Sequence, residues 1–187
     1  ERASGVLMPV SSLPGPYGIG GVDFLASCKQ HYWQILPLTT TSYGDSPYQS
    51  FSARAGNPNF IDFAELIEAG YLEQCDIDGV YLGSDPSNVD YGAIFGGRRQ
   101  ILDRAAERFA ADKPADFDDF VQANEDWLIP YCEFMTVKEE CGLKAFWEWP
   151  AELRTRGEAS AKVCAAHPAR MLYHQMTQYF INSQWSS

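Results

Sequence analysis

Two short apolar runs near the start of the chain constrain the fold more than any other feature of this sequence. They are Val6–Val10 and Trp33–Leu38. Between them, Leu13–Gly18 is dense in proline and glycine, and a helix is predicted to begin near Gly21, with its apolar positions on one face: Phe24, Leu25, Cys28 and Tyr32. A strand, a helix and a second strand in this order predict a βαβ unit whose strands are parallel.

Each apolar run contains a proline, Pro9 in the first and Pro37 in the second. Because proline has no backbone N–H to donate to a β-ladder, we predict that regular pairing of each strand ends there. We also predict a functional edge directly after each strand. In an α/β barrel the strand-to-helix loops gather at the carboxyl ends of the strands and form the rim of the active site.

The rest of the chain has a helical pattern, so we divide it into a βαβ piece at residues 1–62 and a mainly helical region at 63–187. We predict a helix at Phe63–Ala69, closed by Gly70, and a loop over residues 76–92. Further on, the apolar periodicity predicts a helix around 101–109, a helical run over 117–135 broken or kinked at Pro130, and a last helix that begins at Pro168.

Charge and composition narrow the possible partners. The chain has 14 Lys and Arg against 25 Asp and Glu, a net charge of −11, which disfavours nucleic acid and anionic membrane surfaces. No apolar stretch reaches the roughly 20 residues that span a bilayer. We therefore expect a soluble protein. The five cysteines are widely spaced without a Cys-x-x-Cys pair, so we expect reduced thiols in a cytoplasmic protein and no metal site.

The segment Tyr43–Ala53 follows the second predicted strand and mixes aromatic rings with Ser, Asp and Gln side chains. This mixture suits a sugar, because a pyranose ring places its C–H faces on aromatic rings and its hydroxyls need directional hydrogen bonds. The same composition also fits an ordinary polar loop whose tyrosine rings pack inward. From the residues alone both interpretations stay open.

The sequence resembles the opening of the amylomaltase family, which are 4-α-glucanotransferases acting on starch-type α-1,4-glucans. The resemblance is carried by Ser4–Gly20, Tyr32–Leu38, Tyr43–Ala53 and Gly56–Pro58, and more weakly by Val89–Ala93, Phe146–Arg154 and Gln184–Trp185. It implies an α/β fold, the N-terminal part of a (β/α)8 TIM barrel with a large helical insertion subdomain. It also implies α-1,4-glucans and maltooligosaccharides as partners, with no cofactor.

The resemblance also implies roles for four residues. Tyr48 would stack beneath the glucose at the scissile bond, and Ser46 would hydrogen-bond nearby. Tyr43 and Tyr91 match positions that form a second glucan-binding site on the surface of some family members.

The family's reaction is a retaining transfer that needs two carboxyl groups about 5–5.5 Å apart. This sequence contains no counterpart of the family's Arg-Ile-Asp-His nucleophile segment or Glu-Asp-Leu-Gly acid segment, so we assign no catalytic residue and expect those carboxylates to lie outside this chain. Its own carboxylates in helical stretches, including the Glu139–Glu140 pair, are expected to face solvent.

Two alternatives belong to other classes of protein. A dinucleotide site is disfavoured, because Asp23 stands where the third glycine of the Gly-x-Gly-x-x-Gly motif would be. A non-catalytic α-glucan-binding or interaction fragment remains open. Binding without turnover would favour it over the transferase.

Overall fold

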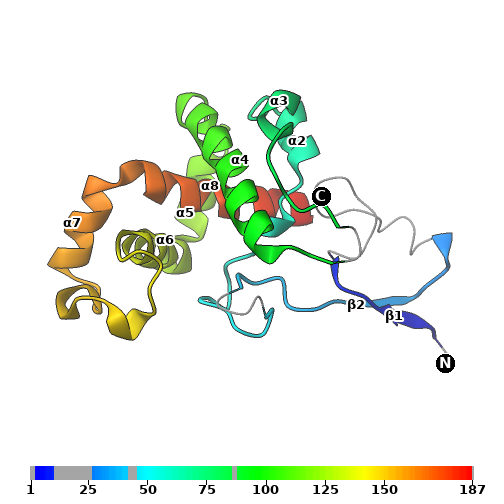
Figure 1. Cartoon of the computed structure of the whole chain (residues 1–187), viewed down its shortest axis with the longest axis horizontal. Helices are drawn as coiled ribbons and strands as arrows, with labels where there is room; N and C mark the ends of the chain where they lie inside the picture. Colours follow the sequence, from blue (N-terminus) through cyan, green and yellow to red (C-terminus); the bar gives the residue numbers. More distant parts are fainter. Residues whose placement is uncertain (1–2, 11–26, 42–45, 86–87, 187) are drawn as a thin grey trace.

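The computed structural model describes residues 3–10, 27–41, 46–85 and 88–186, and consists of a small parallel β-pair beside a helical body (Figure 1). The strands are β1 (Gly5–Leu7) and β2 (Tyr32–Gln34). The helices are α2 (Phe63–Glu68), α3 (Gln74–Ile77), α4 (Tyr91–Ala111), α5 (Phe117–Ala123), α6 (Glu125–Glu140), α7 (Glu158–Ala166) and α8 (Pro168–Ser186), with 3₁₀ turns η2 (Pro58–Phe60), η3 (Phe146–Glu148) and η4 (Ala151–Leu153).

The two predicted strands pair in parallel, as the βαβ pattern indicated. Gly5 lies opposite Tyr32, and Leu7 opposite Gln34. Both strands end before their prolines, β1 at Leu7 and β2 at Gln34. The predicted helix near Gly21 lies largely outside the described residues. Its proposed last position was wrong, since Tyr32 opens β2.

The side chains at the ends of the strand pair are exposed. Leu7 is 63% exposed and Tyr32 is 69% exposed. Figure 1 shows the pair extending away from the helical body. Strands of a parallel sheet are buried only when other elements cover both faces, and the described helices pack on one another instead.

The main core lies where α2, α3, α4, α5 and α8 meet, and the predicted apolar stripes supply it. Ile101, Leu102, Ala105 and Phe109 of α4 are buried against Met176 and Phe180 of α8. Phe109 contacts several aromatic rings, with centroids 4.9 Å from Phe117 and 5.6 Å from Phe180. Edge-to-face contacts of this kind are favourable because the positive edge of one aromatic ring meets the negative face of the other. A second cluster joins α6 to the loop before η2 through its buried members: Ala55, Leu128, Tyr131 and Cys132.

Helix α2 ends as predicted, with Gly70 in the left-handed region at φ 82°, and α8 begins at Pro168 as predicted. The predicted loop over 76–92 was too long, because α4 already begins at Tyr91, where the Asp90 side chain accepts a hydrogen bond from Ala93 N at 2.9 Å. The short helix α3 and the whole of α7 were not predicted.

The helical run over 117–135 is interrupted at Asn124 and continues through Pro130, so the predicted break was placed wrongly. The Asn124 side chain explains the position. Its amide donates to Phe120 O of α5 at 2.9 Å, and its oxygen accepts from the Trp127 side chain of α6, at Nε1, at 3.0 Å, so one side chain is bonded to both helices at the point where they meet. Pro130 is tolerated because its neighbours Leu128 and Tyr131 are buried in the second cluster.

A cluster of charged side chains links α4, α6 and α8, with Glu139 at its centre. Glu139 accepts two hydrogen bonds from Arg170, at 2.7 and 2.9 Å, and lies 3.0 Å from Arg99. Arg170 also reaches Asp103 at 2.5 Å. The Glu139 side chain is only 12% exposed, so the prediction that it faces solvent was wrong.

His174 on α8 completes this cluster. Its ring is 3% exposed, and Nε2 lies 3.2 Å from Glu139 Oε1, a close polar contact that is too poorly aligned for a hydrogen bond. Burial lowers the pKa of His174, more than the neighbouring carboxylate raises it. The imidazole is therefore neutral at neutral pH, packed edge-on against Tyr131 and Tyr173.

The two longest helices, α4 with 21 residues and α8 with 19, both carry polar side chains along their length. Among the residues that the structure describes, no helix combines the length and apolarity that crossing a bilayer requires.

Candidate functional site

The site loop, residues 46–53, follows β2 and is shaped by its own serines. Ser46 Oγ accepts a hydrogen bond from Tyr48 N at 3.3 Å, and Gln49 N donates to Ser46 O at 3.1 Å. Ser50 Oγ donates to Ser52 O at 2.7 Å and lies 3.0 Å from Thr40 Oγ1. Short hydroxyl side chains make these turns because they bond the backbone two residues away.

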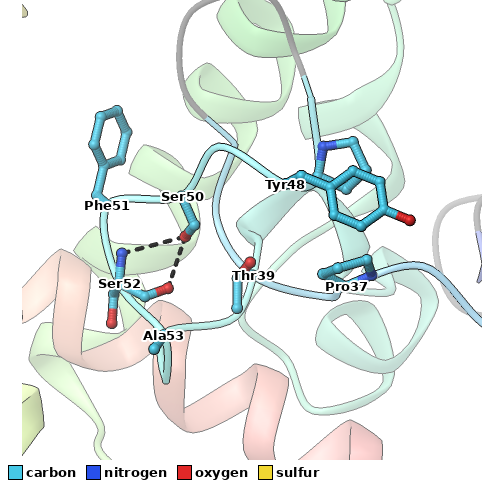
Figure 2. Close-up of a pocket in the computed structure, with 8 residues that line it drawn as sticks. Pro37, Thr39, Tyr48, Ser50, Phe51, Ser52 and Ala53 are labelled. Atoms are coloured by element: carbon cyan, nitrogen blue, oxygen red, sulfur yellow. Dashed lines mark hydrogen bonds between the residues drawn. The ribbon is translucent and has the colours of Figure 1, made fainter.

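An open cavity of about 380 Å³ lies along this loop (Figure 2). Figure 2 shows the Tyr48 ring beside Pro37 and the Phe51 ring at the other end of the loop. Tyr48 is 74% exposed, so its ring is not packed into a core. The complete lining is Pro37, Thr39, Pro47, Tyr48, Ser50, Phe51, Ser52 and Ala53.

The chemistry of this lining favours binding over bond cleavage. Aromatic and proline rings offer flat apolar surfaces, and the hydroxyls of Thr39, Ser50 and Ser52 offer hydrogen bonds. The lining of this cavity, taken over the described residues, includes no Asp, Glu or His that could act as a general acid, a base or a nucleophile. Nor do three His, Cys, Asp or Glu side chains in the described ranges gather to hold a metal ion.

The segment just after the site loop is attached to α8. Gly56 forms an isolated antiparallel bridge with Thr39, and Asn57 N donates to Leu38 O at 2.8 Å. The Gln178 side chain accepts from Gly56 N at 2.8 Å and donates to Gly56 O at 3.0 Å. Gln184 forms the same two bonds with the backbone of Asp62, at 2.8 and 3.0 Å. Two α8 side chains therefore set the position of the chain that follows the site loop.

Gly56 is required at its position because of a close approach to α8. A Cβ built on Gly56 would lie 2.5 Å from Ile181 Cγ2. We expect Gly56→Ala to lower the free energy of unfolding by about 1–3 kcal/mol, measured by urea denaturation. Adding Ile181→Ala should recover part of this loss, because it removes the clashing methyl group. A fully additive double variant would contradict this explanation.

Phe51 connects the site loop to the helical body. Its ring centroid lies 6.1 Å from that of Phe134 on α6, and Lys138 Nζ lies 4.9 Å above the ring. This contact fixes the far end of the loop, opposite Tyr48.

The structure places the predicted site residues in two regions. Ser46 and Tyr48 share the site loop and are joined by a hydrogen bond. Tyr91 is the first residue of α4, is 53% exposed and does not line the cavity. Tyr43 lies outside the described residues.

Of the eight residues that line the cavity, sequence reasoning assigned a ligand contact to Tyr48 and to none of the other seven. Their position directly after the second strand, or inside the sugar-like segment, was the available signal.

Comparisons with known proteins agree on one family. Residues 8–187 match the family model described as 4-alpha-glucanotransferase. The 4-alpha-glucanotransferase of Streptococcus pneumoniae is 49% identical over 196 residues, covering 99% of this chain and 39% of that protein. That of Thermus thermophilus is 37% identical over 199 residues, covering 100% of this chain and 39% of that protein.

A solved structure extends the likeness to three dimensions. The amylomaltase from Streptococcus agalactiae in complex with acarbose superimposes with a TM-score of 0.89 at 45% identity, over 99% of this chain and 40% of that one. The chain thus spans about two fifths of the length of these relatives, and its mostly helical α/β arrangement is shared with the Streptococcus agalactiae structure. On this evidence the chain belongs to the 4-alpha-glucanotransferase family.

Proposed function

We propose that the complete polypeptide encoded by this gene is an amylomaltase. It transfers α-1,4-glucan segments between maltooligosaccharides by a retaining double displacement, and this chain supplies one wall of the glucan-binding groove. The observation that carries the proposal is the exposed Tyr48 ring, held beside an open cavity by a serine-rich loop in a member of this family. A neutral sugar is also compatible with the net charge of −11.

Within the groove we assign stacking beneath a glucose ring to Tyr48. The ring is accessible, and Pro37 beside it extends the apolar surface. Ser46 is assigned a hydrogen bond near the scissile bond, in addition to its role in shaping the turn at Tyr48. The hydroxyls of Ser50 and Thr39 line the same cavity and suit sugar hydroxyls as donors and acceptors.

We assign the two parallel strands to the start of a (β/α)8 barrel, with residues 1–62 as its first unit and 63–187 as a helical insertion region. The exposed Leu7 and Tyr32 support this assignment, because neighbouring strands and helices of a barrel would cover them. The catalytic carboxylates are assigned to residues that this sequence does not contain. The described residues that line the cavity include no Asp or Glu, which supports the assignment of the catalytic carboxylates to other residues.

Tyr91 and Tyr43 are assigned to a second glucan-binding surface. Tyr91 supports this by its 53% exposure at the first turn of α4, outside the cavity beside Tyr48. The alternative function, a non-catalytic glucan-binding fragment, is favoured for this chain alone by the same lack of carboxylates in the described lining.

Glucan binding tests the role of Tyr48. In isothermal titration with maltoheptaose, we expect Tyr48→Ala to raise the Kd by about tenfold or more, since the stacked ring is lost. Tyr48→Phe should bind nearly as well, because it keeps the ring. Tyr81→Ala is the matched control, as Tyr81 is 60% exposed but does not line the cavity.

A disproportionation assay on maltotriose separates the two functions. We expect turnover by the complete polypeptide and none by this chain alone. Turnover by this chain alone would refute the assignment of the carboxylates to missing residues. If neither this chain nor the complete polypeptide binds maltoheptaose, the glucan-binding groove is refuted.

A further inference from the structure

Trp147 is an exposed tryptophan on a tightly held loop, and the proposed groove does not account for it. The side chain is 75% exposed, as much as Tyr48, and its neighbour Phe146 is 44% exposed. Both lie in η3, within the segment 143–149, which we call the Trp147 loop. A large apolar ring presented to solvent in this way indicates a contact surface.

Hydrogen bonds from buried side chains to backbone carbonyls hold the Trp147 loop in place. Lys138 of α6 donates from Nζ to Leu143 O at 3.1 Å and to Lys144 O at 2.9 Å. Trp149 is 2% exposed and donates from Nε1 to Lys144 O at 3.1 Å. At the loop's other end, Arg154 Nε donates to Trp149 O at 2.9 Å. The backbone beneath Trp147 is therefore ordered before any ligand arrives, which reduces the entropy cost of binding.

An unbroken series of ring contacts connects this loop to the proposed groove. Phe51, which lines the cavity, lies 6.1 Å from Phe134, measured between ring centroids. Phe134 lies 5.2 Å from Trp149, and Trp149 lies 5.3 Å from Phe146. We call these four rings the aromatic row. Phe51 and Phe146, at its two ends, are 37% and 44% exposed.

Lys138 contacts both the site loop and the Trp147 loop. Its Nζ lies 4.9 Å above the Phe51 ring while it holds the carbonyls of the Trp147 loop. Burial lowers the pKa of Lys138. The side chain is thus a structural link between the site loop and the Trp147 loop, and it sets their relative position.

We propose that Phe146 and Trp147 form an outer binding platform for glucose units of a long α-1,4-glucan that leaves the groove past Phe51. The inference rests on the proposed function and adds a determinant of chain length to it. Flat aromatic faces match pyranose C–H faces, and the exposed side chains of Lys144 and Glu148 offer hydrogen bonds to sugar hydroxyls beside the rings. The row is buried at Trp149, but its exposed ends, Phe51 in the cavity lining and Phe146 on the Trp147 loop, are only three ring contacts apart, and this proximity favours a glucan over a protein as the occupant.

Titrations with two glucan lengths test the platform, on this chain and on the complete polypeptide. We expect Trp147→Ala to raise the Kd for maltoheptaose by about five- to tenfold and to leave the Kd for maltotriose unchanged, because only the longer ligand extends beyond the groove. Trp147→Phe should retain most of the affinity. Trp185→Ala is the matched control, since Trp185 is 45% exposed on α8 and outside the aromatic row.

The outcomes are distinguishable from failure of the proposed function. If Tyr48→Ala weakens both ligands while Trp147→Ala weakens neither, the groove stands and the platform is wrong. If the wild-type protein binds neither ligand, both are wrong. If Trp147→Ala changes only the mass measured by light scattering after gel filtration, the ring is a protein contact and the platform is overturned.

Discussion

Replacing Glu139 with glutamine is expected to lower the free energy of unfolding by about 3 kcal/mol or more. The change removes the negative charge between Arg170, Arg99 and His174, whose side chains are 22%, 31% and 4% exposed. Removing one partner of a buried ion pair typically costs about 3–5 kcal/mol, and the lower end applies here because Arg170 keeps Asp103 as a second partner. Urea denaturation at neutral pH measures the effect.

The adjacent residue offers a matched control. Glu140 is on the same helix and its side chain is 50% exposed, with a contact to the half-exposed His167 at 3.1 Å. Glu140→Gln should change the free energy of unfolding by less than about 1 kcal/mol, because exposed pairs are screened by solvent. Equal losses for the two variants would show that the Glu139 cluster does not behave as a buried network.

The stability that Glu139 contributes should depend on pH. Burial raises its pKa, but His174 and Arg170 outweigh burial and hold the pKa at about 2, below the ordinary value of 4.5. The contribution is therefore complete above pH 4.5 and is lost as the pH falls toward 2. The difference in unfolding free energy between wild type and Glu139→Gln should shrink across that window, and a constant difference would contradict the assignment.

Replacing Gln178 with leucine is expected to lower the free energy of unfolding by about 2–5 kcal/mol. Gln178 is 2% exposed and is the partner of both the N–H and the carbonyl of Gly56. Each buried backbone group left unsatisfied costs about 1–3 kcal/mol, and two are affected. Because Gly56 follows the site loop, we also expect weaker maltoheptaose binding in isothermal titration.

Gln175→Leu is the control for this substitution. Gln175 is a half-buried residue of the same helix, one turn earlier, so helix propensity and side-chain change are matched. We expect it to change stability by less than about 1 kcal/mol. If Gln178→Leu lowers stability yet leaves glucan binding intact, the site loop does not depend on its attachment to α8.

Features with a strong local cause were predictable from the sequence. Gly70 ends α2 because a glycine takes a positive φ without a Cβ penalty, and Pro168 begins α8 because its missing N–H is not needed in a first turn. The parallel β-pair followed from two apolar runs around a helix-length segment. The sugar-like composition of Tyr43–Ala53 pointed to the loop that lines the cavity, because aromatic rings and hydroxyls are local properties of that segment.

Features that depend on partners distant in the sequence were not predictable. Glu139 has the pattern of a solvent-facing helix residue, and only the packing of α4 and α8 against α6 brings Arg99 and Arg170 to it. Pro130 was misjudged because burial of its neighbours offsets the lost backbone bond.

The sequence by itself determined the parallel β-pair, the ends of α2 and α8 that Gly70 and Pro168 set, the sugar-like composition of the site loop and the resemblance to one enzyme family. The tertiary structure alone decided which distant groups contact each other: the Gln178 side chain with the Gly56 backbone, and the Phe51 ring with the Phe134 ring. The physical reason is the separation in sequence between the interacting groups. Backbone conformation responds to neighbours within a few residues, whereas burial, ion pairing and ring contacts depend on segments that only folding brings together.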